Sequence, residues 1–179
     1  THPKLRPYQK EANDAVEKAI ADRKRKMLVA MATGCGKTFL TVNQVYRLMK
    51  SGVARRVLFL VDRKVLAGQA VRTFAAFDPE PGLKFDRIYE VYSQRFRRDD
   101  LGDDEKFDPK VLPQEYLTNP KVGDAFVYVS TIQRMAMNLF GRGVVFGTSE
   151  EEADEDADKL DIPIHAFDLI IADECHRGY

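Results

Sequence analysis

Two separated groups of residues have the types and spacing needed for phosphate chemistry. The first is the run Ala32-Thr33-Gly34-Cys35-Gly36-Lys37-Thr38. The second is Asp173-Glu174-Cys175-His176, which directly follows the apolar stretch 167–172. Carboxylates at the carboxyl end of a buried strand stand where open α/β sheets place their ligand sites. Together the two groups predict a site that binds and hydrolyses a nucleoside triphosphate.

The glycine-containing run is a candidate phosphate-binding loop. It joins an apolar stretch at 27–31 to a predicted helix, so its backbone N–H groups can surround a phosphate at the helix N-terminus. Lys37 can reach the β- and γ-phosphates, and the Thr38 hydroxyl can bind Mg²⁺. Met31 stands where the general pattern has its first glycine, and the alternative is an ordinary glycine turn before a helix. The predicted nucleotide-binding residues of the loop are Thr33, Gly34, Cys35, Gly36, Lys37 and Thr38.

The acidic group supplies the second half of the predicted site. Mg²⁺ prefers a few carboxylates together with water and phosphate oxygens, so Asp173 suits a direct or water-mediated contact with this ion. Glu174 falls next to the γ-phosphate, where a carboxylate can polarise the attacking water as a general base. His176 either links the nucleotide to a neighbouring domain or is structural. The expected catalytic residues are Glu174, Lys37, Asp173 and His176, against the alternative of a solvated acidic turn.

Alternating helical and strand patterns must position these two groups. The predicted strands are the apolar runs at 27–31, 56–61, 88–92, 125–129 and 167–172. The predicted helices are 8–23, a helix from the glycine loop to about Gly52, 65–77 and 131–140. This alternation predicts an α/β domain with a mostly parallel sheet and helices on both faces. Residues 93–124 are expected to form a long excursion with room for one short helix, and residues 149–161 an acidic surface insertion.

Composition sets the broad class of protein. The chain has 179 residues, of which 44% are hydrophobic, enough for one domain with a packed core and too few for two. Its 28 basic and 28 acidic residues balance, so contact with nucleic acid must come from local patches. No apolar run approaches the roughly 20 residues that span a bilayer, and the start has no signal-peptide pattern. We expect a cytoplasmic protein without a membrane partner, and a chain beginning at Thr1 is expected to be part of a longer polypeptide.

Five short motifs occur in a fixed order along the chain. They are Leu5-Arg6-Pro7-Tyr8-Gln9, Ala32-Thr33-Gly34-Cys35-Gly36-Lys37-Thr38, Asp62-Arg63-Lys64, Ser130-Thr131-Ile132-Gln133 and Asp173-Glu174-Cys175-His176. This set resembles the first motor domain of superfamily-two helicases and translocases. More narrowly, Met31, the run 61–64 and the ending from Asp173 to Gly178 resemble the restriction (R) subunit of type I restriction-modification enzymes. The resemblance covers nearly the whole chain and implies a RecA-like P-loop NTPase domain over residues 1–179.

The resemblance also implies how the base of the nucleotide is held. In that family a glutamine before the first strand recognises adenine, and this residue corresponds to Gln9. An amide side chain can pair with the N6 and N7 edge of adenine. Arg6 in the same motif is assigned to the nucleotide site with it. The alternative is a glutamine that lies in solvent at a helix start.

Loops after later strands grip the nucleic-acid backbone in the same family. The resemblance therefore implies DNA contacts at Arg63, Lys64, Ser130 and Thr131. The alternative for the two cations is an ordinary polar helix start. Other charges are expected to be solvated rather than bound to DNA, namely Arg95, Arg97 and Arg98, and the acidic insertion is expected to be a surface loop or to repel DNA.

The interpretation that unites these features is an ATP-driven motor domain that translocates along duplex DNA. The resemblance implies that it belongs to the R subunit of a type I restriction endonuclease in a bacterial or archaeal cytoplasm, with ATP and Mg²⁺ as cofactors. The implied partners are duplex DNA, modification and specificity subunits, and a second RecA-like domain in the same parent chain that supplies an arginine finger. The alternatives are another superfamily-two motor, acting in DNA repair or remodelling or on RNA, and a non-hydrolysing ATP-binding switch.

Overall fold

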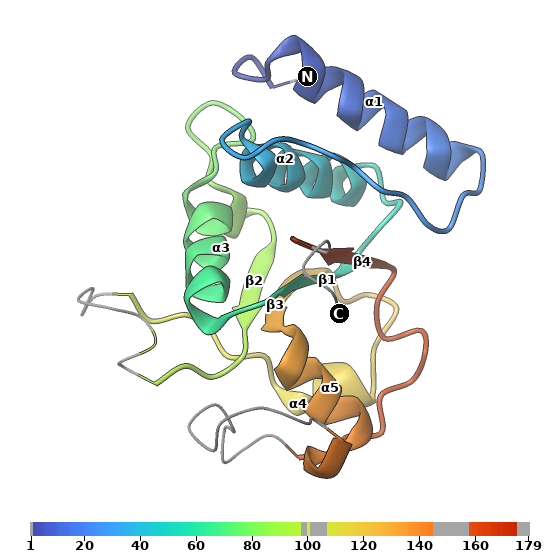
Figure 1. The fold of residues 1–179 in the computed structure, drawn as a ribbon, viewed down its shortest axis with the longest axis vertical. Helices are drawn as coiled ribbons and strands as arrows, with labels where there is room; N and C mark the ends of the chain where they lie inside the picture. Colours follow the sequence, from blue (N-terminus) through green and yellow to red (C-terminus); the bar gives the residue numbers. More distant parts are fainter. Residues whose placement is uncertain (1, 98–99, 101–106, 145–157, 175–179) are drawn as a thin grey trace.

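Four parallel strands form the centre of the domain. A computed structural model describes residues 2–97, 100, 107–144 and 158–174 of the chain (Figure 1). The strands are β1 (Arg56–Val61), β2 (Glu90–Ser93), β3 (Phe126–Thr131) and β4 (Leu169–Ala172), in the order β2-β3-β1-β4. Every pairing between them is parallel, so their carboxyl ends reach the same edge of the sheet. The predicted α/β class with a parallel sheet is confirmed.

Strand β1 is paired on both sides and fixes the register of its neighbours. Val57 lies opposite Val127 of β3 and opposite Leu169 of β4. Its sequence, Arg-Val-Leu-Phe-Leu-Val, has the near-continuous apolar character of a strand that is covered on both faces. Consequently the residues that follow β1, β3 and β4 emerge together at one edge.

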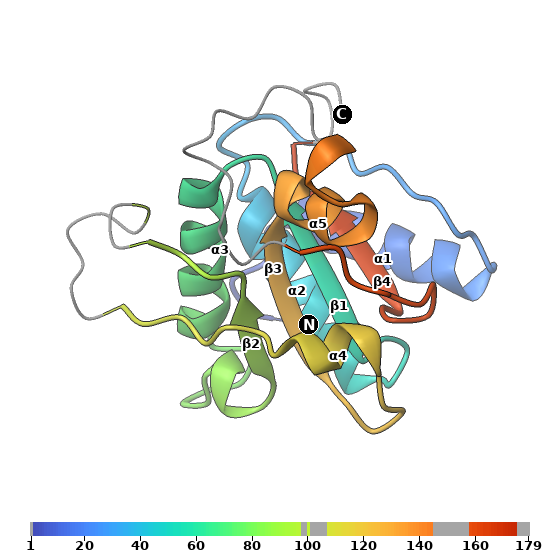
Figure 2. The ribbon, with the colours of Figure 1, turned by 90° about the horizontal axis from the view of Figure 1, so that it is seen from below.

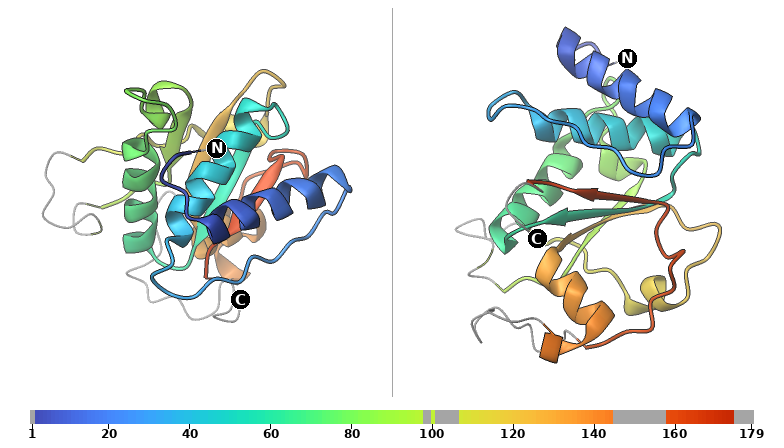
Figure 3. Two further views of the ribbon diagram at one scale, coloured as in Figure 1. Left: turned by 90° about the horizontal axis from the view of Figure 1, so that it is seen from above. Right: turned by 45° about the vertical axis from the view of Figure 1, so that its right-hand side comes forward.

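Helices cover both faces of this sheet. α2 (Lys37–Lys50) and α3 (Lys64–Ala76) pack on one face, and α4 (Gln114–Thr118) and α5 (Ile132–Phe140) pack on the other (Figures 1 and 2). α1 (Pro7–Ala21) lies on the outer side of α2, away from the sheet (Figure 3). Short 3₁₀ turns occur at Phe85–Arg87 and Arg142–Val144.

Two apolar cores hold these layers together. The larger core lies between the sheet and helices α2 and α3, and it includes Val57, Phe59 and Phe74. The smaller core lies between the sheet and helices α4 and α5, and it includes Leu58 and Met135. Successive residues of β1 therefore enter opposite cores, as the alternation of side chains along a strand requires.

Most of the predicted elements are present. The helix expected over 8–23 is α1, the helix after the glycine loop is α2, and residues 93–124 contain the short helix α4. β2 begins at Glu90 rather than at Ile88, because the 3₁₀ turn Phe85–Arg87 occupies the chain just before it. The apolar side chains on the inner face of α2 are buried, namely Val42, Val45, Leu48 and Met49.

The strand predicted at 27–31 does not form, and this prediction was wrong. The segment connects α1 to the glycine loop without pairing with any strand in the described part of the chain, and Leu28 is 78% exposed. β4 is one of the two outer strands of the sheet as described, and its Ile170 is 60% exposed. An apolar run shows that a segment is suited to burial, but its periodicity does not show which neighbour it will pair with.

Several predictions concern residues that the structure does not describe. Residues 149–157 of the acidic insertion, Arg98, Cys175 and His176 lie outside the described residues. The last part of the insertion, residues 158–161, is described, and the carbonyl oxygen of Asp158 accepts a hydrogen bond from Asn138 Nδ2 of α5 at 2.8 Å. None of the helices within the described ranges has the length and apolar character needed to cross a membrane.

Asp168 ties the beginning of β4 to β1. Its Oδ2 atom accepts hydrogen bonds from the backbone amides of Arg55 and Arg56, each at 3.0 Å, and its Oδ1 atom lies 3.3 Å from the Arg56 guanidinium. Partial burial raises the pKa of this carboxyl, but the two amides and the guanidinium outweigh burial and hold the pKa below its usual value. Because β4 carries Asp173 and Glu174 at its other end, this anchor helps to place them.

We predict that Asp168→Asn lowers the free energy of unfolding by about 1 kcal/mol near neutral pH, since a neutral amide oxygen accepts these hydrogen bonds less strongly. A folded-state pKa below the unfolded value stabilises the fold above an unfolded pKa of about 4, and this stabilisation is lost as the pH falls through the folded value. Urea unfolding should therefore show the full difference at about pH 7 and a smaller difference at about pH 2. Asp161→Asn, at an exposed position, is the control, and an equal loss for Asp168→Asn at both pH values would contradict the role of the carboxylate.

Candidate nucleotide and nucleic-acid site

The glycine loop folds tightly against the first turn of α2. Its N-cap residue, Gly36, has a left-handed backbone with a φ of 76°, and Gly34 has a φ of 79°. A side chain would be strained at both positions, so glycine is needed there. Among the described residues no side chain caps the first N–H groups of α2. This is the arrangement in which a helix N-terminus binds an anion.

Gln9 of α1 braces this loop from behind. It is 3% exposed, and its Nε2 atom donates to the carbonyl oxygens of Cys35 at 3.0 Å and Gly36 at 3.3 Å. Its Oε1 atom accepts from the backbone amide of Arg6 at 2.9 Å. A Cβ atom on residue 36 would lie 2.7 Å from Gln9 Nε2, so the brace also requires a glycine there. Tyr8 adds a further contact, because its hydroxyl donates to the Cys35 carbonyl at 3.1 Å.

The adenine-binding roles expected for Gln9 and Arg6 stay predictions. Both hydrogens of the Gln9 amide are directed at the loop, which leaves only a lone pair of Oε1 for a base in this conformation. The alternative of a glutamine in solvent does not fit its burial. Arg6 is exposed, and its Nη1 atom donates to the Tyr8 hydroxyl at 3.0 Å.

The two predicted halves of the site meet directly. Lys37 Nζ lies 2.5 Å from Glu174 Oε1, although the two residues are 137 positions apart in the chain. Their side chains are 27% and 24% exposed, so water and ligands can reach the pair. Asp173 is held at the end of β4, where its backbone amide donates to the Leu60 carbonyl at 2.9 Å. Glu174 follows with a left-handed backbone, at a φ of 54°, which turns the chain at this point.

This arrangement suits a magnesium nucleotide. Lys37 and the N-terminus of α2 present positive charge to a phosphate. Thr38, which is exposed in the first turn of α2, and Asp173 offer the hydroxyl and carboxylate oxygens that Mg²⁺ prefers. Within the described ranges no group of three or more His, Cys, Asp or Glu residues could hold a metal by itself.

Arg63 and Lys64 lie at the N-terminus of α3, at the same edge of the sheet. The Arg63 side chain is 73% exposed, and its Nε atom lies 3.5 Å from Asp62 Oδ2. The Lys64 side chain is 15% exposed, and its Nζ atom lies 3.5 Å from Asp100 Oδ2. Both the expected DNA contact and the alternative of a polar helix start agree with this placement, so the contact stays a prediction.

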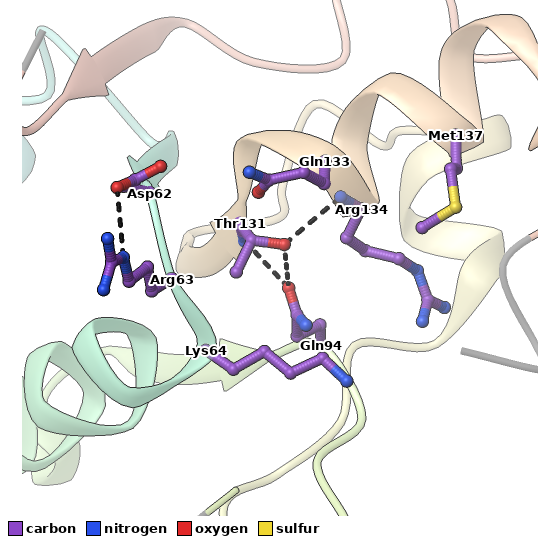
Figure 4. A pocket seen from close by; sticks show the side chains of 8 residues that line it. All are labelled: Asp62, Arg63, Lys64, Gln94, Thr131, Gln133, Arg134 and Met137. Atoms are coloured by element: carbon purple, nitrogen blue, oxygen red, sulfur yellow. Dashed lines mark hydrogen bonds and ion pairs between the residues drawn. The ribbon is translucent and has the colours of Figure 1, made fainter. Parts of the chain in front are cut away.

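Ser130 and Thr131 are both buried and are held by Gln94, which follows β2. Figure 4 shows the contact between Thr131 and Gln94. Gln94 Oε1 accepts from the Thr131 backbone amide at 2.8 Å, from the Thr131 hydroxyl at 3.0 Å and from the Ser130 hydroxyl at 3.4 Å. The Thr131 hydroxyl in turn accepts from the Arg134 amide at 3.2 Å, which caps α5. These hydroxyls serve the junction between β3 and α5 in this structure, and their predicted contact with DNA stays a prediction.

Two residues of this region, Gln94 and Tyr8, are not predicted by the motifs as contacts of the site. Gln94 stands at the start of the long excursion, outside every motif, and Tyr8 has the spacing of an apolar helix position. No local pattern separates a buried bridging glutamine from a solvated one. Only the pairing of β2 with β3 places Gln94 beside Thr131.

Comparison with known proteins assigns the family. The sequence profile of the ResIII family, described as the res subunit of type III restriction enzymes, matches residues 2–179. The chain belongs to the ResIII family. The matched region includes the glycine loop, Arg63 and Lys64, and the acidic pair that follows β4.

Curated relatives of this ResIII chain include restriction enzymes. It is 31% identical over 175 residues to the endonuclease subunit of the type I restriction enzyme EcoKI from Escherichia coli strain K12, covering 98% of the chain and 12% of that relative. It is 26% identical over 178 residues to the corresponding subunit of EcoAI from Escherichia coli, covering 97% of the chain and 16% of that relative. The predicted resemblance to type I restriction subunits is confirmed, and the chain spans a small part of their length.

A helicase also matches part of the ResIII chain. Over 84 residues, 46% of the chain and 14% of the relative, it is 37% identical to a candidate mitochondrial ATP-dependent helicase of Schizosaccharomyces pombe. No solved structure gives a significant match.

We predict that Gln9→Glu weakens nucleotide binding about tenfold, because the new carboxylate keeps an acceptor for the Arg6 amide but turns an anionic oxygen toward two loop carbonyls. Titration with a fluorescent ATP analogue measures this effect. Gln69→Glu, at an exposed position on α3, adds the same charge and should bind as the wild type does. Unchanged affinity in Gln9→Glu would show that the brace does not shape the phosphate loop.

Proposed function

We propose that this chain is an ATP-hydrolysing motor domain with which a type I restriction enzyme moves along duplex DNA. The observation that carries the proposal is the 2.5 Å contact between Lys37 and Glu174, since it shows that the glycine loop and the acidic pair lie side by side. Membership of the ResIII family supports it, and so do the names of the EcoKI and EcoAI endonuclease subunits. The helicase relative supports the use of ATP.

Binding of the triphosphate would begin at the N-terminus of α2. The backbone N–H groups of residues 34–38 and the Lys37 ammonium would hold the β- and γ-phosphates. Thr38 and Asp173 would hold Mg²⁺, which neutralises charge on the phosphates when it is bound. The glycines at 34 and 36 let the backbone approach the phosphates closely, because no Cβ atom stands in the way.

The ion pair between Lys37 and Glu174 gives nucleotide binding a direct catalytic consequence. A γ-phosphate would compete with Glu174 for the Lys37 ammonium, because both offer anionic oxygens to it. Glu174 is then able to accept a hydrogen bond and a proton from the water that attacks the phosphate. In this mechanism the nucleotide itself converts Glu174 from the partner of a cation into a general base.

The proposal extends to the rest of the enzyme. The chain covers 12% and 16% of the length of its type I relatives, which leaves room in such a polypeptide for a second RecA-like domain carrying an arginine finger. Modification and specificity subunits are the proposed protein partners, and duplex DNA is the proposed substrate of translocation. A cytoplasmic location in a bacterium or archaeon stays a prediction.

The second candidate is a superfamily-two motor outside restriction, which the helicase relative favours. The commonest RNA helicases end the acidic motif in Asp-Glu-Ala-Asp, whereas this chain has Asp173-Glu174-Cys175-His176. A non-hydrolysing ATP switch is disfavoured, because a switch has no need of a carboxylate beside the phosphate-binding lysine.

We predict that Glu174→Gln lowers ATP turnover by about 100-fold or more, since the amide cannot accept the proton from water. ATP affinity should be unchanged or higher, because the neutral side chain competes less strongly for Lys37. Phosphate release and equilibrium ATP binding, both measured with duplex DNA present in the complete natural polypeptide containing this sequence, test the two effects separately. Glu115→Gln, an exposed position on α4, is the control, and wild-type turnover in Glu174→Gln would favour the switch.

A further inference from the structure

α1 is attached to the domain mainly through polar contacts. It lies along the outer side of α2 (Figures 1 and 3), and the two helices run in the same direction, because the start of α1 contacts the start of α2 and its later turns contact later turns of α2. The structure describes every residue of α1, and the two that are buried are both amides, Gln9 and Asn13. From this helix only Ile20, which is partly buried, packs against the larger apolar core. Hydrogen bonds therefore do much to decide where α1 sits on α2.

Three polar contacts join the two helices in order along their length. Gln9 Nε2 donates to the loop carbonyls at the N-terminus of α2. Asn13 Nδ2 donates to Asn43 Oδ1 at 2.9 Å, and Glu17 Oε1 lies 2.6 Å from Arg47 Nε. Gln9, Asn13 and Glu17 recur every four residues, so they lie on one face of α1. The last contact is between partly exposed charges and constrains the helices only weakly.

The contact between Asn13 and Asn43 has the properties of a register lock. The two side chains are 1% and 2% exposed. A hydrogen bond between amides requires a narrow range of distance and angle, whereas apolar contact has no preferred direction. Sliding or rotating α1 on α2 would separate the two amides and leave them buried without this partner, which is costly. Buried polar residues fix the register of paired helices in coiled coils by the same means.

This lock acts close to the brace of the phosphate loop. Asn13 lies about one helical turn from Gln9 on the same face of α1, so fixing Asn13 also fixes the height and the rotation of Gln9. Gln9 has little freedom at the loop, since even a Cβ atom on residue 36 would come within 2.7 Å of its Nε2 atom. A displaced α1 would therefore either break the hydrogen bonds of Gln9 to the loop or press on the loop backbone.

We propose that Asn13 and Asn43 are positioning residues for the nucleotide site, because their hydrogen bond sets the register of α1 on α2 and so holds Gln9 against the phosphate loop. The inference rests on the proposed function, since it concerns binding of the same nucleotide. It adds two residues that lie outside all five sequence motifs and that do not contact the loop themselves. A pair that only stabilised the fold would leave nucleotide affinity unchanged in a folded variant.

The test measures equilibrium binding of a fluorescent ATP analogue with Mg²⁺ by the complete natural polypeptide containing this sequence. Asn13→Leu combined with Asn43→Leu replaces the amide pair by an apolar contact of similar shape, which leaves neither amide buried without its partner. This variant should melt close to the wild-type temperature but bind the analogue about tenfold more weakly, because its register is no longer fixed. Glu11→Leu, at an exposed position on α1, is the control and should bind as the wild type does.

A double-mutant cycle with Gln9→Ala separates positioning from a general loss of stability. Because the pair acts through Gln9, adding the two leucines to Gln9→Ala should weaken binding by less than about twofold further. Asn13→Ser removes the contact with Asn43 without adding volume, and it should give the same result in the same cycle. If the leucine variant melts well below the wild type, the cycle with Asn13→Ser decides. Wild-type affinity in the deciding variant, or an undiminished loss in the Gln9→Ala background, would overturn the inference.

Lys37→Met tests the proposed nucleotide site independently of α1. It removes the ammonium that would hold the phosphates, so it should weaken binding of the analogue at least about tenfold. Unchanged affinity in Lys37→Met would overturn the proposed nucleotide site together with the inference. A loss in Lys37→Met accompanied by wild-type affinity in the asparagine variants would overturn the inference alone.

Discussion

The parallel pairing of β1 with β3 on one side and β4 on the other is the constraint on which the rest of the structure depends. It brings residues from distant parts of the chain to a single edge, where Asp62 follows β1, Ile132 follows β3 and Asp173 follows β4. The helices that begin at this edge, α3 and α5, add the positive ends of their dipoles. One edge of one sheet thus holds both the residues proposed for phosphate chemistry and those proposed to contact DNA.

The proposed nucleotide site combines a fixed part with an exchangeable part. Gln9 is buried and hydrogen-bonded to the backbone of the loop, and the left-handed glycines have no low-energy replacement, so the loop is held in shape before a ligand arrives. The contact of Lys37 with Glu174 is different, because both side chains are partly exposed and ion pairs in such positions contribute only about 0–1 kcal/mol. A phosphate with several negative charges can therefore replace Glu174 at small cost. The loop backbone is therefore held by several contacts, whereas the ion pair proposed to take part in catalysis can exchange partners.

Residue patterns over short stretches of the chain predict much of the fold and of the candidate site. The glycine loop is identified by residue type and spacing, and the apolar face of α2 is identified by its periodicity, because both depend on residues close together in the chain. The meeting of Lys37 and Glu174 was expected from a general property of parallel sheets, whose strands end at a common edge. Because the acidic pair directly follows a strand of that sheet, it could be expected at the same edge.

Features that depend on which distant strand or side chain a segment contacts could not be predicted from local sequence. The apolar run at 27–31 has the composition of a strand, but pairing requires a free partner in register, and the run remains an exposed connection. Gln94 accepts a hydrogen bond from Thr131, which lies 37 residues further along the chain. No residue pattern near Gln94 indicates that the two residues are neighbours in the fold. Gln9 was identified by its motif, yet its contacts with the loop carbonyls follow from how α1 packs against α2.

The most direct test of the ATP site is a crystal structure with a non-hydrolysable ATP analogue and Mg²⁺. Our interpretation predicts that Lys37 Nζ leaves Glu174 and contacts the γ-phosphate, while Glu174 faces the position of the attacking water. A bound nucleotide with the pair between Lys37 and Glu174 intact, or a nucleotide bound away from the N-terminus of α2, would contradict it.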